Sequence, residues 1–193
     1  MVPICGVVDA HNHLGDEFGG GWHRRSVDEL VAEMDASGVD VLVDLDGGWG
    51  EDILYSRLAF LKDKHPDRFI CFGGIDWQRW AELGSAFRAW ATERLIAQVE
   101  RGAQGLKVWK PFGLTVCDDL GKRVAINDAR LDPIWATAAK LKIPVTIHVA
   151  DPAAFFRPMD CQNERYLELL DHPEWHFCGS GFPTMTSLLN DFS

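Results

Sequence analysis

Short apolar runs rich in β-branched residues alternate along the chain with longer segments in which apolar residues recur at helical spacing. This alternation of strands and helices is typical of a parallel β/α architecture. Five strands are predicted, at residues 4–9, 39–44, 69–75, 105–109 and 144–149. The sequence therefore predicts an α/β fold in which a helical segment follows each strand.

The predicted helices carry recognisable start and stop signals. Ser26 and Glu29 form a capping box ahead of an apolar face, and Gly38 ends the helix. Asp132 is expected to cap the helix before the fifth strand, with Pro133 as its first residue. The helix before the fourth strand carries Phe87, Trp90, Ala91 and Val99 at roughly helical spacing.

The spacing of the predicted strands indicates the size of the complete fold. The strand centres near Val7 and Ile147 are separated by four strand-to-strand intervals, which gives about 35 residues per β/α unit. At this pitch the 193 residues hold about five and a half units, whereas an eight-stranded barrel needs about 280 residues. We therefore predict that residues 1–193 form a single domain, a partial TIM (β/α)8 barrel of five to six units.

Composition and charge narrow the classes of partner. Hydrophobic residues make up 47% of the chain and charged residues 25%, as in ordinary globular proteins. The formal net charge of −10 and the lack of a basic run disfavour binding to nucleic acid or to an anionic membrane. The five cysteines are scattered without a CxxC pair, and no signal peptide or apolar spanning segment is visible. We expect a cytoplasmic protein.

The strongest candidate for chemistry is the run Asp9-Ala10-His11-Asn12-His13, at the exit of the first predicted strand. Side chains two residues apart in a strand point to the same face, so both imidazoles can face one cation, with Asp9 in phase one layer below. Catalytic zinc sites combine about three such protein ligands with an open position for water. The alternative is that His11 and His13 are loop residues that bond to solvent or backbone.

Two polar residues in later strands also alternate with apolar neighbours. His148 near the end of the fifth strand and Lys107 in the fourth are each out of phase with the residues beside them, which favours an inward direction. An inward lysine is costly to bury without a partner. The alternatives are a buried, hydrogen-bonded histidine and a salt bridge from Lys107 to an interior carboxylate such as Asp9.

Together these positions resemble the amidohydrolase superfamily, and more closely its amidohydrolase-related group of metal-dependent hydrolases and decarboxylases on a (β/α)8 barrel. The similarity runs through VVDAHNH at the first strand, GLKVWKPFGL, IPVTIHVADPAAFF and NERYLELLDHPEW. The resemblance implies that His11 and His13 are the first metal pair and that His148 is a further ligand. In some members the strand-four lysine, here Lys107, is carboxylated and bridges two metals, but the amidohydrolase-related group often uses one. We expect one divalent ion, zinc.

The resemblance implies a metal-dependent hydrolase in which activated water attacks a C–N or C–O bond of a small-molecule substrate. Catalytic roles are expected for His148 and Lys107. Lys110 and Arg157 are candidates for holding an anionic substrate, with solvated loop charges as the alternative. The family's later histidine and its strand-eight aspartate, the expected general base, have no counterpart before Ser193. We therefore expect a barrel truncated at its C-terminus that could be inactive alone.

Two alternatives to the hydrolase stay open. One is a metal-dependent decarboxylase on the same scaffold, in which the metal grips the substrate carboxylate. The other is a non-catalytic fragment that binds metal weakly or not at all. An open barrel would expose strand edges and favour a homo-oligomer. Asp44, Asp46 and Asp76 also follow predicted strands, where contact with substrate is one role and capping of the next helix is the more common one.

Overall fold

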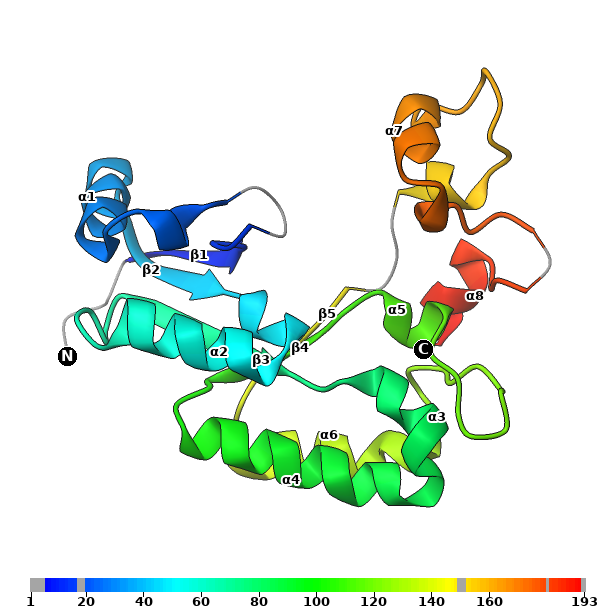
Figure 1. Cartoon of the computed structure of the whole chain (residues 1–193), viewed down its shortest axis with the longest axis horizontal. Coiled ribbons are helices and arrows are strands. Elements are labelled where there is room, and N and C mark those ends of the chain that lie inside the picture. The colour runs from blue at the N-terminus through cyan, green and yellow to red at the C-terminus, as the bar shows by residue number, and fades with distance from the viewer. Residues whose placement is uncertain (1–5, 17–19, 149–151, 180, 192–193) are drawn as a thin grey trace. The chain divides into compact units, whose positions relative to one another are not determined.

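One five-stranded parallel sheet, in the order β1-β2-β3-β4-β5, runs through the computed structural model, which describes residues 6–16, 20–148, 152–179 and 181–191 (Figure 1). Hydrogen-bonded parallel pairing joins β1 to β2, β2 to β3 and β3 to β4, while the Leu106 N–H donates to the Pro144 carbonyl beside β5. This sequential order is that of consecutive units in a TIM barrel, so the predicted partial (β/α)8 architecture is confirmed. The strands are β1 (Val7–Asn12), β2 (Val39–Asp44), β3 (Phe69–Gly74), β4 (Gly105–Val108) and β5 (Val145–Ile147).

Helices connect each strand to the next. In chain order they are α1 (Val27–Ser37), α2 (Glu51–Arg57), α3 (Trp80–Leu83), α4 (Phe87–Glu100), α5 (Pro111–Leu114), α6 (Asp132–Leu141), α7 (Tyr166–Asp171) and α8 (Met185–Asn190). The 3-10 turn η2 (Asp46–Trp49) precedes α2, and a π-helical turn at Leu58–Lys62 follows it. No helix in the described part of the chain has the length and apolar character needed to cross a membrane.

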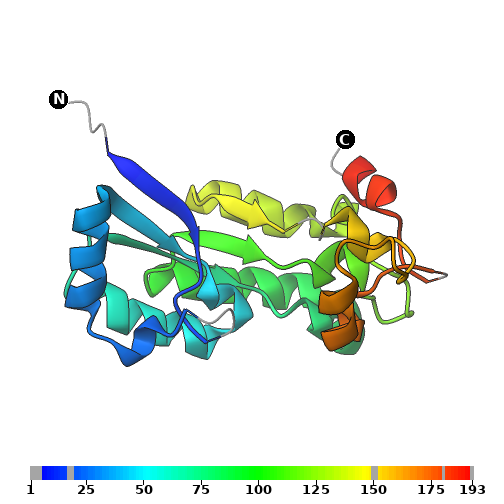
Figure 2. The same ribbon diagram turned by 90° about the horizontal axis from the view of Figure 1, so that it is seen from above.

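The chain divides into two compact units, each assembled from segments far apart in sequence. The first comprises Met1–Asp76, Arg88–Val108 and Pro133–Thr146, and it contains β1 to β4 (Figure 2). The second comprises Trp77–Phe87, Trp109–Asp132 and Ile147–Ser193. The expectation of a single domain stays a prediction.

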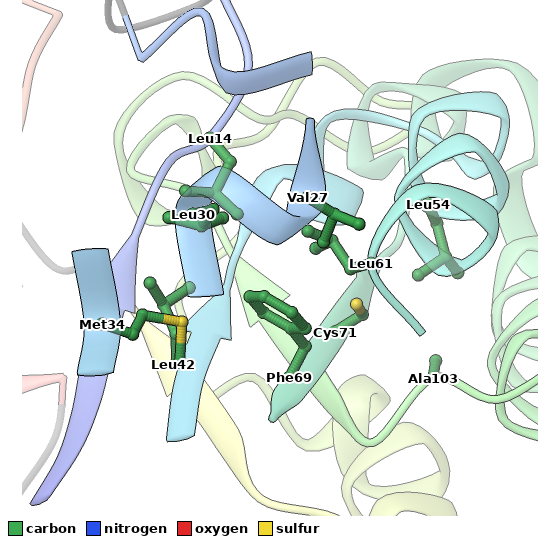
Figure 3. Packing of buried hydrophobic residues seen from close by; sticks show 10 residues of the cluster. All are labelled: Leu14, Val27, Leu30, Met34, Leu42, Leu54, Leu61, Phe69, Cys71 and Ala103. Atoms are coloured by element: carbon green, nitrogen blue, oxygen red, sulfur yellow. The ribbon is translucent and has the colours of Figure 1, made fainter. Parts of the chain in front are cut away.

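The second half of β2, from Leu42 on, and most of β3 are buried on both faces in the first unit. Leu42, Phe69 and Cys71 pack with residues of α1 and α2, such as Leu30 and Leu54 (Figure 3). On the opposite face a second cluster contains Val43, Leu45 and Phe72. Burial on both faces is expected of parallel strands and accounts for the consecutive apolar residues Leu42 and Val43 of β2 and Phe69 to Phe72 of β3.

The second unit has an apolar cluster of its own. Its buried members come from α5, the segment after β5, α7 and α8, and they are Leu114, Phe155, Leu169, Phe177 and Leu188. The four cysteines within the described residues, Cys71, Cys117, Cys161 and Cys178, are free thiols.

Helix α1 begins and ends where the sequence predicts. The Ser26 side chain accepts a hydrogen bond from the Asp28 N–H at 3.2 Å, which satisfies a donor of the first turn. Gly38 ends the helix with φ 70°, a left-handed conformation that favours glycine. Leu30 and Met34 are buried on the face that the apolar spacing predicts.

Other boundaries differ from prediction. Strand β1 runs from Val7 to Asn12, later than expected, so His11 lies within the strand; Ile4 and Cys5 of the predicted strand lie outside the described residues. Asp132 does not cap α6, because a 3-10 turn precedes it and the Asp128 side chain accepts from the Arg130 N–H instead.

The turn η2 lies directly against the end of β3 because glycines leave room for it. A Cβ atom added to Gly47 would lie 2.2 Å from the Phe72 carbonyl oxygen, and one added to Gly74 would lie 2.5 Å from the backbone of Gly48. These backbone contacts fix the position of η2, whose first residue is Asp46.

We predict that Gly47→Ala lowers the free energy of unfolding by about 1–3 kcal/mol, because the methyl group overlaps a backbone carbonyl that cannot rotate away. Gly50→Ala is the matched control: Gly50 has an extended backbone and open space around its Cβ position. Urea unfolding of both variants measures the difference. Equal stability of the two would show that close packing at Gly47 does not hold η2 in place.

Candidate functional site

His11 and His13 lie together at the carboxyl end of β1. Their Nε2 atoms are 3.3 Å apart, and the two rings meet edge to face at 77°. His11 is exposed, whereas the side chain of His13 is only 14% exposed. The structure thus brings two imidazole nitrogens to one point, as a shared cation would require.

A register shift in β1 separates Asp9 from these histidines. Asp9 pairs with Leu42 and Asn12 pairs with Asp44, so three steps along β1 match two steps along β2. The extra residue interrupts the alternation of side chains, as a β-bulge does. The prediction that Asp9 lies in phase with both histidines is therefore wrong, because it assumed a regular strand.

Asp46 holds the far side of the His13 ring. Its Oδ1 lies 3.0 Å from His13 Nδ1, and its Oδ2 accepts a hydrogen bond from the Gly15 N–H at 2.6 Å. The Nε atom of Arg57 lies 3.3 Å from the same Oδ2. The role expected from the sequence, capping of the next helix, is wrong for Asp46: η2 has no side-chain cap, because the carboxylate is engaged by these three groups.

The contact with Asp46 determines which nitrogen of His13 carries hydrogen. An ionised carboxylate can only accept, so Nδ1 of His13 is the donor of this bond. In the neutral ring the lone pair then lies on Nε2, the atom that faces His11.

Asp44 and Asp46 are two buried carboxyls near one guanidinium. Burial and the negative charge of Asp46 raise the pKa of Asp44 above its usual value, against the opposing charge of Arg57. Burial alone would also raise the pKa of Asp46, but hydrogen bonds from His13 and the Gly15 N–H, with the Arg57 charge, hold it below its usual value. Asp46 therefore carries the negative charge, and Asp44 keeps its proton more readily.

Lys107 is almost completely buried in β4, with 1% of its surface exposed. In the register of β3 and β4, Lys107 pairs with Gly74 and Gly105 pairs with Phe72, so the alternation of side chains along β4 is regular. Lys107 therefore points to the face opposite its apolar neighbours, as the sequence alternation predicts. Burial lowers the pKa of Lys107 to about 8. Partial desolvation of the His11 ring lowers its pKa, although the residue as a whole is exposed, and the charge of Lys107 lowers it further.

The donor set fits a divalent metal that prefers nitrogen ligands. Two nitrogens bound to one tetrahedral zinc lie about 3.3 Å apart when each Zn–N bond is about 2.0–2.1 Å, and the two Nε2 atoms have this separation. Metal-binding histidines usually donate their other N–H to a carboxylate or carbonyl, as His13 does. His11 and His13 can therefore hold a metal.

Within the described residues, no group of three or more His, Cys, Asp or Glu side chains is gathered for a metal ion. His148, the expected further ligand, is half-buried and follows Ile147 of β5, in the second unit. Its role as a ligand and in catalysis stays a prediction.

The two predicted substrate-binding residues also lie in the second unit. The Lys110 ammonium is 5.0 Å from the centroid of the Trp175 ring and 5.9 Å from that of Phe155, which is cation–π distance. Arg157 is exposed, and its carbonyl accepts a hydrogen bond from His176 Nε2 at 2.9 Å. Binding of an anionic substrate by Lys110 and Arg157 stays a prediction.

Sequence reasoning missed the role of Asp46 and the burial of Arg57. The available signal was the pair of acids two positions apart at the end of β2, because the carboxyl ends of neighbouring parallel strands meet at one edge of a sheet. Arg57 carried no such signal, since it lies at the end of α2 in an otherwise ordinary helical sequence.

Two solved structures are similar to this chain. An amidohydrolase from Mycobacterium avium subsp. paratuberculosis K-10 is 20% identical over 75% of this chain and 38% of that chain, with a TM-score of 0.48. A probable 2-pyrone-4,6-dicarboxylic acid hydrolase from Acinetobacter baumannii, with citric acid bound, is 14% identical over 90% of this chain and 56% of that chain, with a TM-score of 0.45. The chain thus spans 38% and 56% of the lengths of these two proteins.

No family model and no curated protein matches the chain. The β/α architecture is established by the strand order and connecting helices of the chain itself.

We predict that Lys107→Met stabilises the protein at pH 7 by up to about 3 kcal/mol, and that this gain disappears at high pH. Lysine ordinarily titrates near 10.5 and Lys107 near 8, so between these values the unfolded chain binds more protons than the folded one. The unfolding free energy of the wild type therefore rises with pH relative to that of the variant.

Urea unfolding at pH 7, 8.5 and 10.5 measures this difference. Lys140→Met, at an exposed lysine of α6, is the control and should differ from wild type by the same small amount at each pH. A difference between Lys107→Met and wild type that does not change with pH would contradict the lowered pKa.

Proposed function

We propose that the protein is a metal-dependent hydrolase of the amidohydrolase-related type, which uses water to cleave a C–N or C–O bond of a small molecule. His11 and His13 would hold one divalent ion, with zinc as the first candidate and His148 as a further ligand. The observation that carries this proposal is the facing pair of Nε2 atoms with a buried carboxylate behind His13.

When bound there, the metal would supply Lewis-acid activation of water and of the scissile group at neutral pH. The chain's own residues would provide orientation and charge. Asp46 and Arg57 orient His13 from behind. Lys107 places a positive charge that acts on His11, and its pKa of about 8 lets it hold or release a proton near neutral pH.

The proposed substrate is a small molecule with an anionic group, for which Lys110 and Arg157 are the candidate binding residues. The net charge of −10 opposes binding of polyanions over the surface as a whole. Individual cationic side chains such as these can still select a small carboxylate or phosphate by direct contact.

We predict that the metal-free protein binds one zinc ion per chain. His11→Ala and His13→Ala should each weaken zinc affinity by more than about 100-fold, the upper end of the loss caused by changes outside the ligand shell. Isothermal titration with zinc chloride measures stoichiometry and affinity. His65→Ala is the control, because His65 contacts Asp28 on the surface, at 2.7 Å. The proposal fails if the wild type binds no stoichiometric zinc, or if His11→Ala binds it as the wild type does.

A panel of amide, ester and lactone substrates beside unsaturated and aromatic carboxylic acids separates hydrolysis from decarboxylation, which the same fold and ligands can support. Hydrolysis products without release of CO2 are expected, and His11→Ala should abolish them. Release of CO2 from a carboxylic acid, without hydrolysis of any substrate, would contradict the proposed hydrolase and support the decarboxylase.

A further inference from the structure

We infer that Asp46 is a positioning residue that fixes His13 in the tautomer with hydrogen on Nδ1 and thereby directs the Nε2 lone pair toward His11. The functional value of this arrangement rests on the proposed metal pair. The arrangement itself is a property of the chain and can be measured without a metal.

The two oxygens of Asp46 face groups of different kinds. Oδ2 accepts a hydrogen bond from the Gly15 N–H at 2.6 Å and forms an ion pair with the Arg57 guanidinium, whose Nε lies 3.3 Å away. Oδ1 faces the His13 ring, whose Nδ1 lies 3.0 Å away. The side chain is 1% exposed, so water does not compete effectively for these bonds.

The backbone around the carboxylate is held in place on both sides. A Cβ atom added to Gly15 would lie 2.5 Å from Arg57 Nη2 and 3.0 Å from Asp46 Oδ2, so loop, guanidinium and carboxylate are packed at contact. The carbonyls of Leu14 and Gly15 accept hydrogen bonds from the N–H groups of Trp22 and Gly21, both at 2.9 Å. The carboxylate therefore has little freedom to exchange its two oxygens.

This asymmetry makes Asp46→Asn a sharp test, because the change keeps the shape of the side chain while it removes the negative charge and replaces one oxygen by an NH2 donor. The Gly15 N–H, which donates at the Oδ2 position, and the positive charge of Arg57 beside it favour the amide oxygen there over the NH2 group. The amide NH2 must then face His13 Nδ1 and donate to it. Nδ1 would lose its hydrogen, and the hydrogen would move to Nε2, where it blocks the lone pair.

The experiment is two-bond 1H–15N NMR of the full metal-free chain at pH 8, where an ordinary histidine is neutral. The His13 signals are assigned by their loss in His13→Ala. The wild type should show His13 with hydrogen on Nδ1, and Asp46→Asn should show it on Nε2. Hydrogen on Nε2 in the wild type, or on Nδ1 in Asp46→Asn, would overturn the inference. The wild-type spectrum decides the matter even if the variant does not fold.

Asp28→Asn is the matched control, because it removes a carboxylate from beside another histidine, His65, at the surface. It should leave the His13 signals and zinc binding unchanged. Zinc titration should show that Asp46→Asn weakens affinity about 10–100-fold. Equal zinc affinity in wild type and Asp46→Asn would overturn the positioning role. A tautomer switch in a protein whose wild type binds no zinc would uphold the inference and refute the metal site.

Discussion

The buried carboxylate of Asp46 joins three separate parts of the first unit. It meets the ring that follows β1, the backbone of the loop at Gly15 and the guanidinium at the end of α2. The contacts with His13 and Gly15 span 33 and 31 residues of sequence, and together with the ion pair to Arg57 they hold the loop after β1 against the turn after β2. The Asp46 carboxylate thereby holds the ring of His13, whose Nε2 lies 3.3 Å from that of His11.

The ionisable groups buried in this region have shifted pKa values. One guanidinium serves two carboxyls, and the second of them, Asp44, keeps its proton more readily because its neighbour is already ionised. Burial of Lys107 is reflected in its pKa, which desolvation lowers to about 8. Such perturbed groups at the carboxyl ends of parallel strands are typical of functional sites.

The bounds of elements that depend on neighbouring residues alone could be predicted from the sequence. Strand β2 has the bounds that its apolar run predicts, and α1 is bounded by Ser26 and Gly38 because side-chain capping and a left-handed glycine act within a few residues. The same logic failed at Asp132, because a 3-10 turn lies directly upstream and its Asp128 side chain accepts the hydrogen bond from the Arg130 N–H.

The sequence by itself determined the β/α class, the five strands and the pairing of two histidines at a strand end, because side-chain periodicity and short-range spacing encode them. Only the tertiary structure decided that β1 carries an extra residue between Asp9 and Asn12, since register depends on the partner strand. It also decided that Asp46 serves His13 rather than a helix. An aspartate takes the best donors that surround it, and here those donors lie 31 and 33 residues away along the chain.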